Sequence, residues 1–288
     1  MRKYIFFSLS IILLFLCLLV WQFAVFSDQK LHIIFCDVGQ GDAILITTPS
    51  GKQIIVDGGP DESVLSCLSD HMPFWDRKIE LMILSHPHAD HLNGLIEVLD
   101  HYTIDHFATE PLANDTTGYK ELLRKVKIEN WKLKILLAGD TIHIGDGVVL
   151  HVLGPTEDYL KRTSPGGMVG ESAEFGSIIS MISYGDFDLL LDGDSQVAGL
   201  NDALQGQSLQ KIDVLQVPHH GSRFGLDKEL VEQIDPKLAV ISVGKNNYGH
   251  PAPAILTLLQ NAGIKYLRTD EDGNVDIVSN GKTFWLYH

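Results

Sequence analysis

Four side chains that commonly bind metal ions stand within the six residues 86–91, and they are His86, His88, Asp90 and His91. Imidazole nitrogens and carboxylate oxygens suit zinc, manganese or iron. The segment directly follows an apolar run at 79–84, so a rigid strand end would hold a loop that turns several side chains toward one point. A helix cap needs only one such residue. The segment therefore predicts a metal site.

Three further segments with this chemistry also follow apolar runs. Asp194 is a carboxylate that could bridge two ions, although Asp-Gly pairs are also common in ordinary turns. His219 and His220 are adjacent, so one could bind metal while the other faces substrate. His250 is either a catalytic group or part of a turn. Because functional groups gather where strands end in loops, we expect all three segments to converge with residues 86–91.

The elements that would position these residues follow from the spacing of apolar side chains. Strands are expected at 31–38, 43–48, 53–56, 79–84, 104–108, 134–137, 148–153, 178–184, 187–191, 214–217, 239–243 and 266–269. Helices are expected at 61–71, 92–102, 227–234 and 252–262. We therefore predict an α/β fold in which residues 29–288 form one domain with two sheets and flanking helices.

The N-terminus differs in kind, because residues 4–26 form an apolar run that follows Arg2 and Lys3. A helix that spans a membrane needs roughly 20 apolar residues. A cleaved secretory signal should end in a small-x-small site, whereas residues 22–26 are bulky. We expect residues 1–28 to be a single-pass anchor in the cytoplasmic membrane, with the domain outside. The alternative is a cleaved signal and a secreted domain.

The acidic composition limits how the chain could meet nucleic acid. Its formal net charge is -15 at pH 7. A protein that binds nucleic acid through its whole surface is usually basic. This chain would need a local basic patch or bound metal ions to approach phosphates.

Two of the three cysteines, Cys36 and Cys67, lie in the predicted domain. A disulfide between them is possible outside the cell. Spacing alone cannot establish it, and we expect two buried free thiols. No CxxC pair exists, so the sequence gives no indication of a structural zinc site built on cysteine.

Together, these segments resemble the metallo-β-lactamase superfamily. That resemblance implies an αββα sandwich with a metal site at its edge, two Zn2+ ions being expected and Mn2+ being the alternative. Asp57 matches the aspartate that supports the metal loop in that superfamily. The positions that match its ligands are His86, His88, Asp90, His91, Asp194, and either His219 or His220.

The resemblance is closer to the extracellular hydrolase domain of ComEC-like DNA-uptake proteins, and it runs from Leu31 to the C-terminus. It implies a phosphodiesterase or nuclease, with a nucleic acid or another phosphodiester as substrate. ComEC resembles a polytopic channel, whereas this chain has one anchor, so a role in DNA uptake does not transfer automatically. The matching segments are 37–43, 84–91, 217–222, 248–251 and 268–273.

One departure from the superfamily concerns the second ion. The family supplies another histidine before a Gly-Ser strand start, and residues 170–177 contain no histidine here. The asparagine that ComEC-like domains carry there is absent too. Glu171 or Glu174 could substitute as an oxygen ligand. Alternatively, the ion held by His86 and His88 is bound weakly or lost.

The expected activity is hydrolysis by metal-activated water. Asp90 and Asp194 would hold or orient the ions and the water. His250, or whichever of His219 and His220 is not a ligand, would stabilise developing charge or protonate the leaving group, which makes His220 a candidate for either role. One alternative is a lactonase or other hydrolase on the same scaffold. A second is a metal-weakened, non-catalytic binding module associated with DNA uptake.

Overall fold

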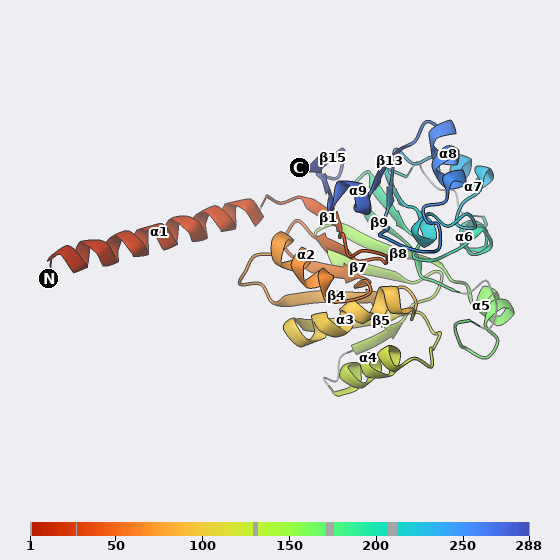
Figure 1. Cartoon of the computed structure of the whole chain (residues 1–288), viewed down its shortest axis with the longest axis horizontal. Helices are drawn as coiled ribbons and strands as arrows, with labels where there is room; N and C mark the ends of the chain where they lie inside the picture. Colours follow the sequence, from red (N-terminus) through yellow and green to blue (C-terminus); the bar gives the residue numbers. More distant parts are fainter. Residues whose placement is uncertain (1, 27, 129–131, 171–175, 207–211, 288) are drawn as a thin grey trace.

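The chain folds around two β-sheets that lie face to face (Figure 1). This computed structural model describes residues 2–26, 28–128, 132–170, 176–206 and 212–287, without the side chains of residues 2, 3, 5, 19 and 21–26. The described residues of the first sheet form eight strands, in the order β15 (Phe284–Tyr287), β14 (Val275–Ser279), β1 (Leu31–Phe35), β2 (Ile44–Thr47), β3 (Gln53–Val56), β4 (Lys78–Leu84), β5 (Thr103–Thr109) and β6 (Lys132–Ile135). Those of the second form seven, in the order β13 (Lys265–Arg268), β12 (Leu238–Ile241), β11 (Val214–Gln216), β10 (Phe187–Leu191), β9 (Ile179–Tyr184), β8 (Val148–Gly154) and β7 (Thr141–Gly145).

Helices cover the outer face of each sheet, which makes four layers (Figure 1). The first sheet packs against α2 (Ser63–His71), α3 (Ala89–His101) and α4 (Thr117–Ile128). The second packs against α6 (Val197–Leu204), α7 (Lys228–Ile234) and α8 (Pro253–Asn261). The other described helices of the domain are α5 (Glu157–Thr163), the 3₁₀ turn η1 (Pro218–Gly221) and α9 (Thr269–Asp272).

The residues of β1 explain why this strand lies between two cores. Leu31, Ile33 and Phe35 belong to the core between the sheets. Ile34 and Cys36 belong to the core between the first sheet and its helices. Successive side chains of a strand point to opposite faces, so the continuous apolar stretch at residues 33–36 can fill both cores. The predicted α/β fold with two sheets is confirmed.

Strand direction brings the polar segments to one edge of the sandwich. Strands β3 to β6 run parallel, as do β10 to β13. The C-terminal ends of parallel strands meet at the same edge, where α/β proteins commonly place their ligands. Residues 85–91, 192–194, 217–222 and 242–250 follow β4, β10, β11 and β12.

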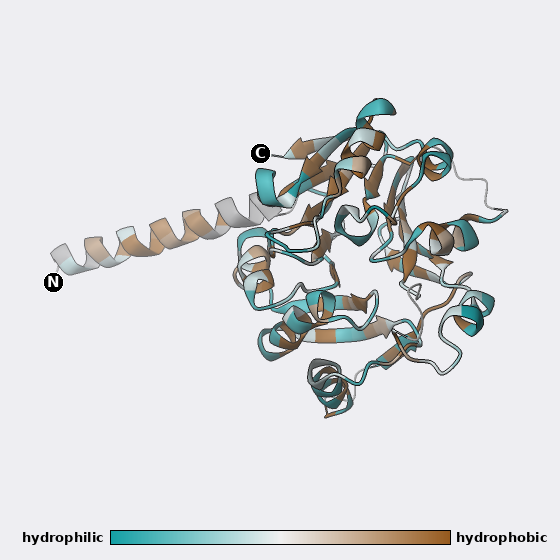
Figure 2. Cartoon of the chain, turned by 45° about the vertical axis from the view of Figure 1, so that its right-hand side comes forward, coloured by the Kyte–Doolittle hydropathy of each residue, from teal (hydrophilic) through white to brown (hydrophobic). Residues whose placement is uncertain are grey.

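Helix α1 (Arg2–Phe26) projects away from the sandwich (Figure 1). Hydrophobic residues dominate its described part (Figure 2), and exposed side chains include Phe6 and Leu13. Among the residues that the structure describes, no helix meets the combined length and hydropathy expected of a membrane span. The anchor at residues 1–28 stays a prediction.

The expectation of two free thiols is wrong, because Cys36 and Cys67 form a disulfide. Cys36 follows β1 and Cys67 lies on α2, and both belong to the core between sheet and helices. Their Cα atoms are 5.8 Å apart, which is within the range that a disulfide bridges. The bond ties the segment that leads into residues 37–42 to α2.

Candidate metal centre

The segment 86–91 leaves β4 and enters α3. His86 is fully buried just beyond the strand, and His88 is the N-cap residue of the helix. The helix begins at Ala89, three residues before the predicted start, so Asp90 and His91 occupy its first turn. A carboxylate there is favoured by the helix dipole. The Nε2 atom of His86 lies 2.9 Å from Nδ1 of His88, as expected if both rings face one point.

A first set of candidate ligands, which we call the His91–His220 group, comprises Asp42, His91, Asp194 and His220. All four side chains are buried, and their ligand atoms lie within 4.8 Å of one another. Asp194 Oδ1 lies 3.2 Å from His91 Nε2 and 3.4 Å from His220 Nε2. Asp90 adds a second carboxylate, with Oδ2 3.5 Å from His220 Nε2.

Asp42 was not predicted as a site residue, although the segment 37–43 was matched to the ComEC-like domain. Its carboxylate lies 3.8 Å from Nδ1 of His91 and 3.5 Å from Nδ1 of His220. Asp194 and Asp90 face the opposite Nε2 atoms, so we assign Asp42 to the support of the two rings and not to the ion. The Gln216 amide donates a hydrogen bond of 2.7 Å to Asp42, which fixes this carboxylate.

A second set, the His86–His88 group, comprises His86, His88 and Asp194. His86 Nε2 lies 3.6 Å from Asp194 Oδ2. The two oxygens of Asp194 therefore face different groups, Oδ1 toward His91 and Oδ2 toward His86. This is the arrangement that a bridging carboxylate needs, and it is the role expected of Asp194 from the sequence.

The adjacent residues His219 and His220 differ in burial and in contacts, as the sequence analysis allowed. His220 is buried, and its Nδ1 atom lies 2.9 Å from the carbonyl oxygen of Ser242, which orients Nε2 toward Asp194. His219 is 26% exposed at its side chain and lies with Nε2 3.6 Å from Asp194 Oδ2. Both residues have left-handed backbones, with φ of 52° and 54°. Such strain in non-glycine residues is concentrated at functional sites.

Asp57 supports the centre from behind, as the resemblance implied. Its Oδ2 lies 2.8 Å from His91 Nδ1. The backbone N–H and the hydroxyl of Ser85 donate hydrogen bonds of 2.7 and 2.6 Å to the Asp57 carboxylate. The same hydroxyl lies 3.0 Å from His86 Nδ1. Carboxylates that hold the second nitrogen of a ligating histidine fix the orientation of the ring.

The charges in the two groups differ. Burial alone would lower the pKa of His91 and His220, but Asp194 and the other carboxylates outweigh it and raise both pKa values well above the usual range. Burial would raise the pKa of Asp194, but His91 and His220 outweigh it and lower that pKa well below its usual range. Burial, reinforced by neighbouring imidazoles, lowers the pKa of His86 and His88.

Three inward-facing atoms of the His91–His220 group lack a hydrogen-bond partner. They are His91 Nε2, Asp194 Oδ1 and His220 Nε2, and all three are buried in the described part of the chain. Native proteins rarely leave buried polar atoms unsatisfied, and a bound ion is one common reason for such a cluster. Two imidazole nitrogens and a carboxylate, with Asp90 beside them, are a donor set that suits zinc or manganese.

His250 lies next to the centre but outside both groups. Its ring centroid is 5.5 Å from that of His219. Burial and the nearby His219 and His220 lower the pKa of His250. The two glutamates considered as substitute ligands, Glu171 and Glu174, lie outside the described residues.

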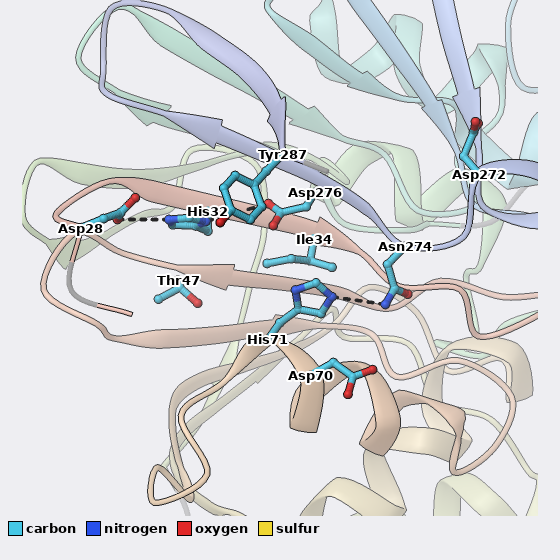
Figure 3. Close-up of a pocket in the computed structure, with 10 residues that line it drawn as sticks. All are labelled: Asp28, His32, Ile34, Thr47, Asp70, His71, Asp272, Asn274, Asp276 and Tyr287. Atoms are coloured by element: carbon cyan, nitrogen blue, oxygen red, sulfur yellow. Dashed lines mark hydrogen bonds and ion pairs between the residues drawn. The ribbon is translucent and has the colours of Figure 1, made fainter. Parts of the chain in front are cut away.

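A cavity of about 630 Å³ lies elsewhere, on the first sheet beside α2 (Figure 3). Two pairs of polar residues line it. His32 Nε2 lies 3.1 Å from Asp28 Oδ1, and His71 Nε2 lies 3.2 Å from Asn274 Nδ2. None of the predicted metal ligands lines this cavity, so it is separate from the centre.

Comparisons with known proteins agree with this geometry. Residues 36–245 match the family model of the metallo-beta-lactamase superfamily. The chain is 28% identical to ComE operon protein 3 of Bacillus subtilis over 86% of its own length and 33% of the relative's. It is 29% identical to Recombination protein 2 of Haemophilus influenzae over 83% and 27%. The chain thus spans about a third of the length of these relatives.

Among solved structures, Igni18, a metallo hydrolase from the archaeon Ignicoccus hospitalis, superposes with a TM-score of 0.56 at 14% identity. The match covers 85% of this chain and 98% of that one. At this identity the likeness supports the fold alone.

Proposed function

The chain belongs to the metallo-β-lactamase superfamily, and from that premise we propose that it is a metal-dependent hydrolase of phosphodiester bonds. The observation that carries the proposal is the set of three buried atoms around Asp194 that lack hydrogen-bond partners among the described residues. Two bound divalent ions, zinc or manganese, would neutralise a phosphate and lower the pKa of water.

The ligands divide between two ions that would share Asp194. His91, His220 and Asp90 would hold the first ion. His86 and His88 would hold the second. Asp57 keeps the His91 ring in place through Nδ1 and leaves Nε2 for the ion. Asp90, at the rim of the first position and partly exposed, would also orient the attacking water.

His250 would act on the substrate from the open side of the centre. Its lowered pKa keeps the imidazole neutral near pH 7, so the ring can donate an N–H hydrogen bond but carries no full charge. A neutral donor beside His219 suits a group that stabilises developing negative charge. We assign that role to His250.

A phosphodiester is favoured over an uncharged substrate for two reasons. Paired ions provide the positive charge that a chain with a net charge of -15 otherwise lacks. Relatives named Competence protein ComA, Recombination protein 2 and ComE operon protein 3 also direct attention to nucleic acid. Because the chain spans only about a third of such relatives, a part in DNA uptake is a proposal that their names support and nothing more.

We also propose that α1 attaches the domain to the outer face of the cytoplasmic membrane. Its apolar run at residues 4–26 supports this proposal. Strand direction supports it too. Strands β1 and β4 run in the same direction, so their N-terminal ends lie at the same edge of the sheet. The exposed Phe74 and Trp75, which precede β4, therefore lie at the edge where α1 joins β1. Aromatic side chains favour membrane interfaces. Recovery of the chain in alkaline-washed membranes with Met1 retained is expected, and a soluble, shortened chain would contradict it.

The hydrolase proposal is tested with the full chain in detergent, loaded with zinc or manganese. A chromogenic phosphodiester, single-stranded DNA, a lactone and a β-lactam are assayed in parallel. Turnover of the two phosphodiesters is expected. Turnover of the lactone or the β-lactam alone would replace the proposed substrate class, and turnover of none by protein with bound metal would favour a non-catalytic binding module.

A further inference from the structure

Two neighbouring loops extend from the candidate centre to the surface. The first follows β11 and contains His219 and His220, and the second follows β12 and contains His250. The backbone N–H of Ala252 donates a hydrogen bond of 2.8 Å to the carbonyl oxygen of Gly221, which joins the two loops. The loops are therefore joined three residues before Phe224 on the first and four residues after Tyr248 on the second.

Each loop presents one exposed aromatic ring and one exposed cation. On the first loop, Phe224 is 55% exposed, and the guanidinium of Arg223 lies 4.6 Å from the centre of its ring. On the second loop, Tyr248 is 77% exposed, and Lys245 is exposed three residues earlier. Neither Arg223 nor Lys245 forms an ion pair with the described residues, in a chain that carries 22 basic against 37 acidic residues.

The exposed position of Tyr248 is fixed by its own loop. The side-chain oxygen of Asn246 accepts hydrogen bonds of 3.0, 3.0 and 3.1 Å from the backbone N–H groups of Tyr248, Gly249 and His250. The side-chain nitrogen of Asn246 donates to the carbonyl oxygens of Gly244 and His250. One side chain thus holds the loop by five bonds, so the ring is presented to solvent at a low entropic cost of ordering.

The rings also connect this surface to the centre. The ring of Tyr248 lies 5.9 Å from that of His250, with 35° between their planes. The ring of His250 lies 5.5 Å from that of His219, whose Nε2 atom is 3.6 Å from Asp194. A nucleotide whose base stacked on Tyr248 would therefore carry its phosphate close to the candidate centre.

From this arrangement we propose that Tyr248 and Phe224 stack on unpaired bases of a single-stranded nucleic acid, while Arg223 and Lys245 contact the phosphates beside those bases. Exposed aromatic rings combined with cations are how proteins bind single strands without sequence preference. In a duplex the faces of the bases are already stacked, so this surface selects single strands. The inference rests on the proposed function and names its substrate class.

Binding is measured by fluorescence anisotropy with the full chain in detergent and EDTA, so that no cleavage occurs. The probes are a labelled oligothymidylate and an abasic oligonucleotide of equal length and charge. Tyr248→Leu is expected to weaken oligothymidylate binding by about 5- to 150-fold, as the loss of one base stack does, and to leave abasic binding unchanged. Tyr248→Phe retains the ring and is expected to bind like the wild type.

Phe74→Leu provides the control, because Phe74 is as exposed (56%) as Phe224 (55%) but precedes β4, at the opposite edge of the sandwich. It is expected to leave binding unchanged, whereas Phe224→Leu is expected to weaken it. A 2-aminopurine base in the oligonucleotide should lose fluorescence on binding to the wild type and less on binding to Tyr248→Leu. Thermal melting of each variant separates a lost contact from a lost fold.

The proposal is overturned if Tyr248→Leu binds oligothymidylate like the wild type, or if the abasic oligonucleotide binds as tightly as oligothymidylate. It is also overturned if Tyr248 is needed for binding anionic lipid vesicles and not for binding the oligonucleotide. Failure of the proposed function is a different result, in which the metal-loaded wild type binds the single strand in this base-dependent way and cleaves no phosphodiester.

Discussion

The His91–His220 group and the His86–His88 group share Asp194, but their surroundings differ. In the first group every side chain is buried, and Asp57, Ser242 and Gln216 hold His91, His220 and Asp42 from behind. In the second group His88 is partly exposed, at the N-terminus of α3. The difference is the one expected if a preformed ion position stands beside a position that is open toward substrate.

The charges support the same contrast. Carboxylates surround His91 and His220 and raise their pKa values despite burial. His86 and His88 have lowered pKa values because they are buried among other imidazoles. An ion in the first group would be held by opposite charge as well as by nitrogen atoms, so we expect it to bind more tightly.

The largest effect that distinguishes the groups is expected from deleting one histidine of each. His220→Ala should weaken binding of the tighter ion by more than about a hundredfold. Removing even a residue that only orients a ligand lowers metal affinity by about 10- to 100-fold. His88→Ala should remove only the weaker ion. Chelator competition followed by elemental analysis measures both. His101→Ala, on the exposed end of α3, is the control. Equal losses of metal affinity in the two site variants would contradict a difference between the groups.

A smaller effect is expected from Asp57→Asn, which keeps the size of the side chain but removes its charge. Asp57 contacts His91 Nδ1 and is not itself a ligand in this proposal. The affinity for the tighter ion should therefore fall by about 10- to 100-fold, and the affinity for the weaker ion should change little. Asp61→Asn changes an exposed carboxylate on the same loop and should have no effect. A complete loss of metal from Asp57→Asn would make Asp57 a ligand.

The pH dependence of metal binding should also separate the groups. His91 and His220 have raised pKa values, so near pH 7 protons compete with the metal, and affinity should fall as pH falls, by up to about tenfold per pH unit for each proton displaced. His86 and His88 are already neutral, so their ion should be less sensitive. The ion remaining in His88→Ala should therefore show a steeper dependence between pH 6 and 8 than the one remaining in His220→Ala.

The smallest effect concerns a buried carboxyl that belongs to neither group. Burial raises the pKa of Glu110 well above its usual range, and its oxygens have no partner among the described side chains. A raised pKa in the fold favours the protonated form, so this residue costs stability as pH rises above about 4. Glu110→Gln should raise the melting temperature at pH 7.5 and leave it unchanged at pH 4. Glu97→Gln, on the partly exposed side of α3, is the control.

The sequence was sufficient to predict the fold class and the convergence of residues 86–91, 194, 219 and 220, because both depend on local patterns. Apolar runs followed by polar residues identify strand ends, and residues 86–91 carry four ligand types in one such place. The roles of His219 and His220 required their backbone angles, since two adjacent left-handed residues turn one ring inward and the other toward the surface.

Other features depend on contacts between distant segments. Asp42 lies in the turn between β1 and β2, and only the fold brings it beside His91 on α3 and Gln216 on β11. The Cys36–Cys67 bond required the distance between β1 and α2. The strands β14 and β15 were not predicted. Strand β14 pairs with β1 from the other end of the chain, and β15 pairs with β14. Helix α4 was not predicted either, although its buried residues Tyr119, Leu122 and Val126 have the i, i+3, i+7 spacing of an amphipathic helix.

We propose that Asp194 bridges two ions, one in each group. The most direct test is the metal content of the full chain and of Asp194→Ala after equilibration with zinc or manganese. Two ions per wild-type chain are expected, with both lost from the variant, because Oδ1 and Oδ2 face different groups. A variant that keeps both ions, or a wild type that binds none, would contradict it.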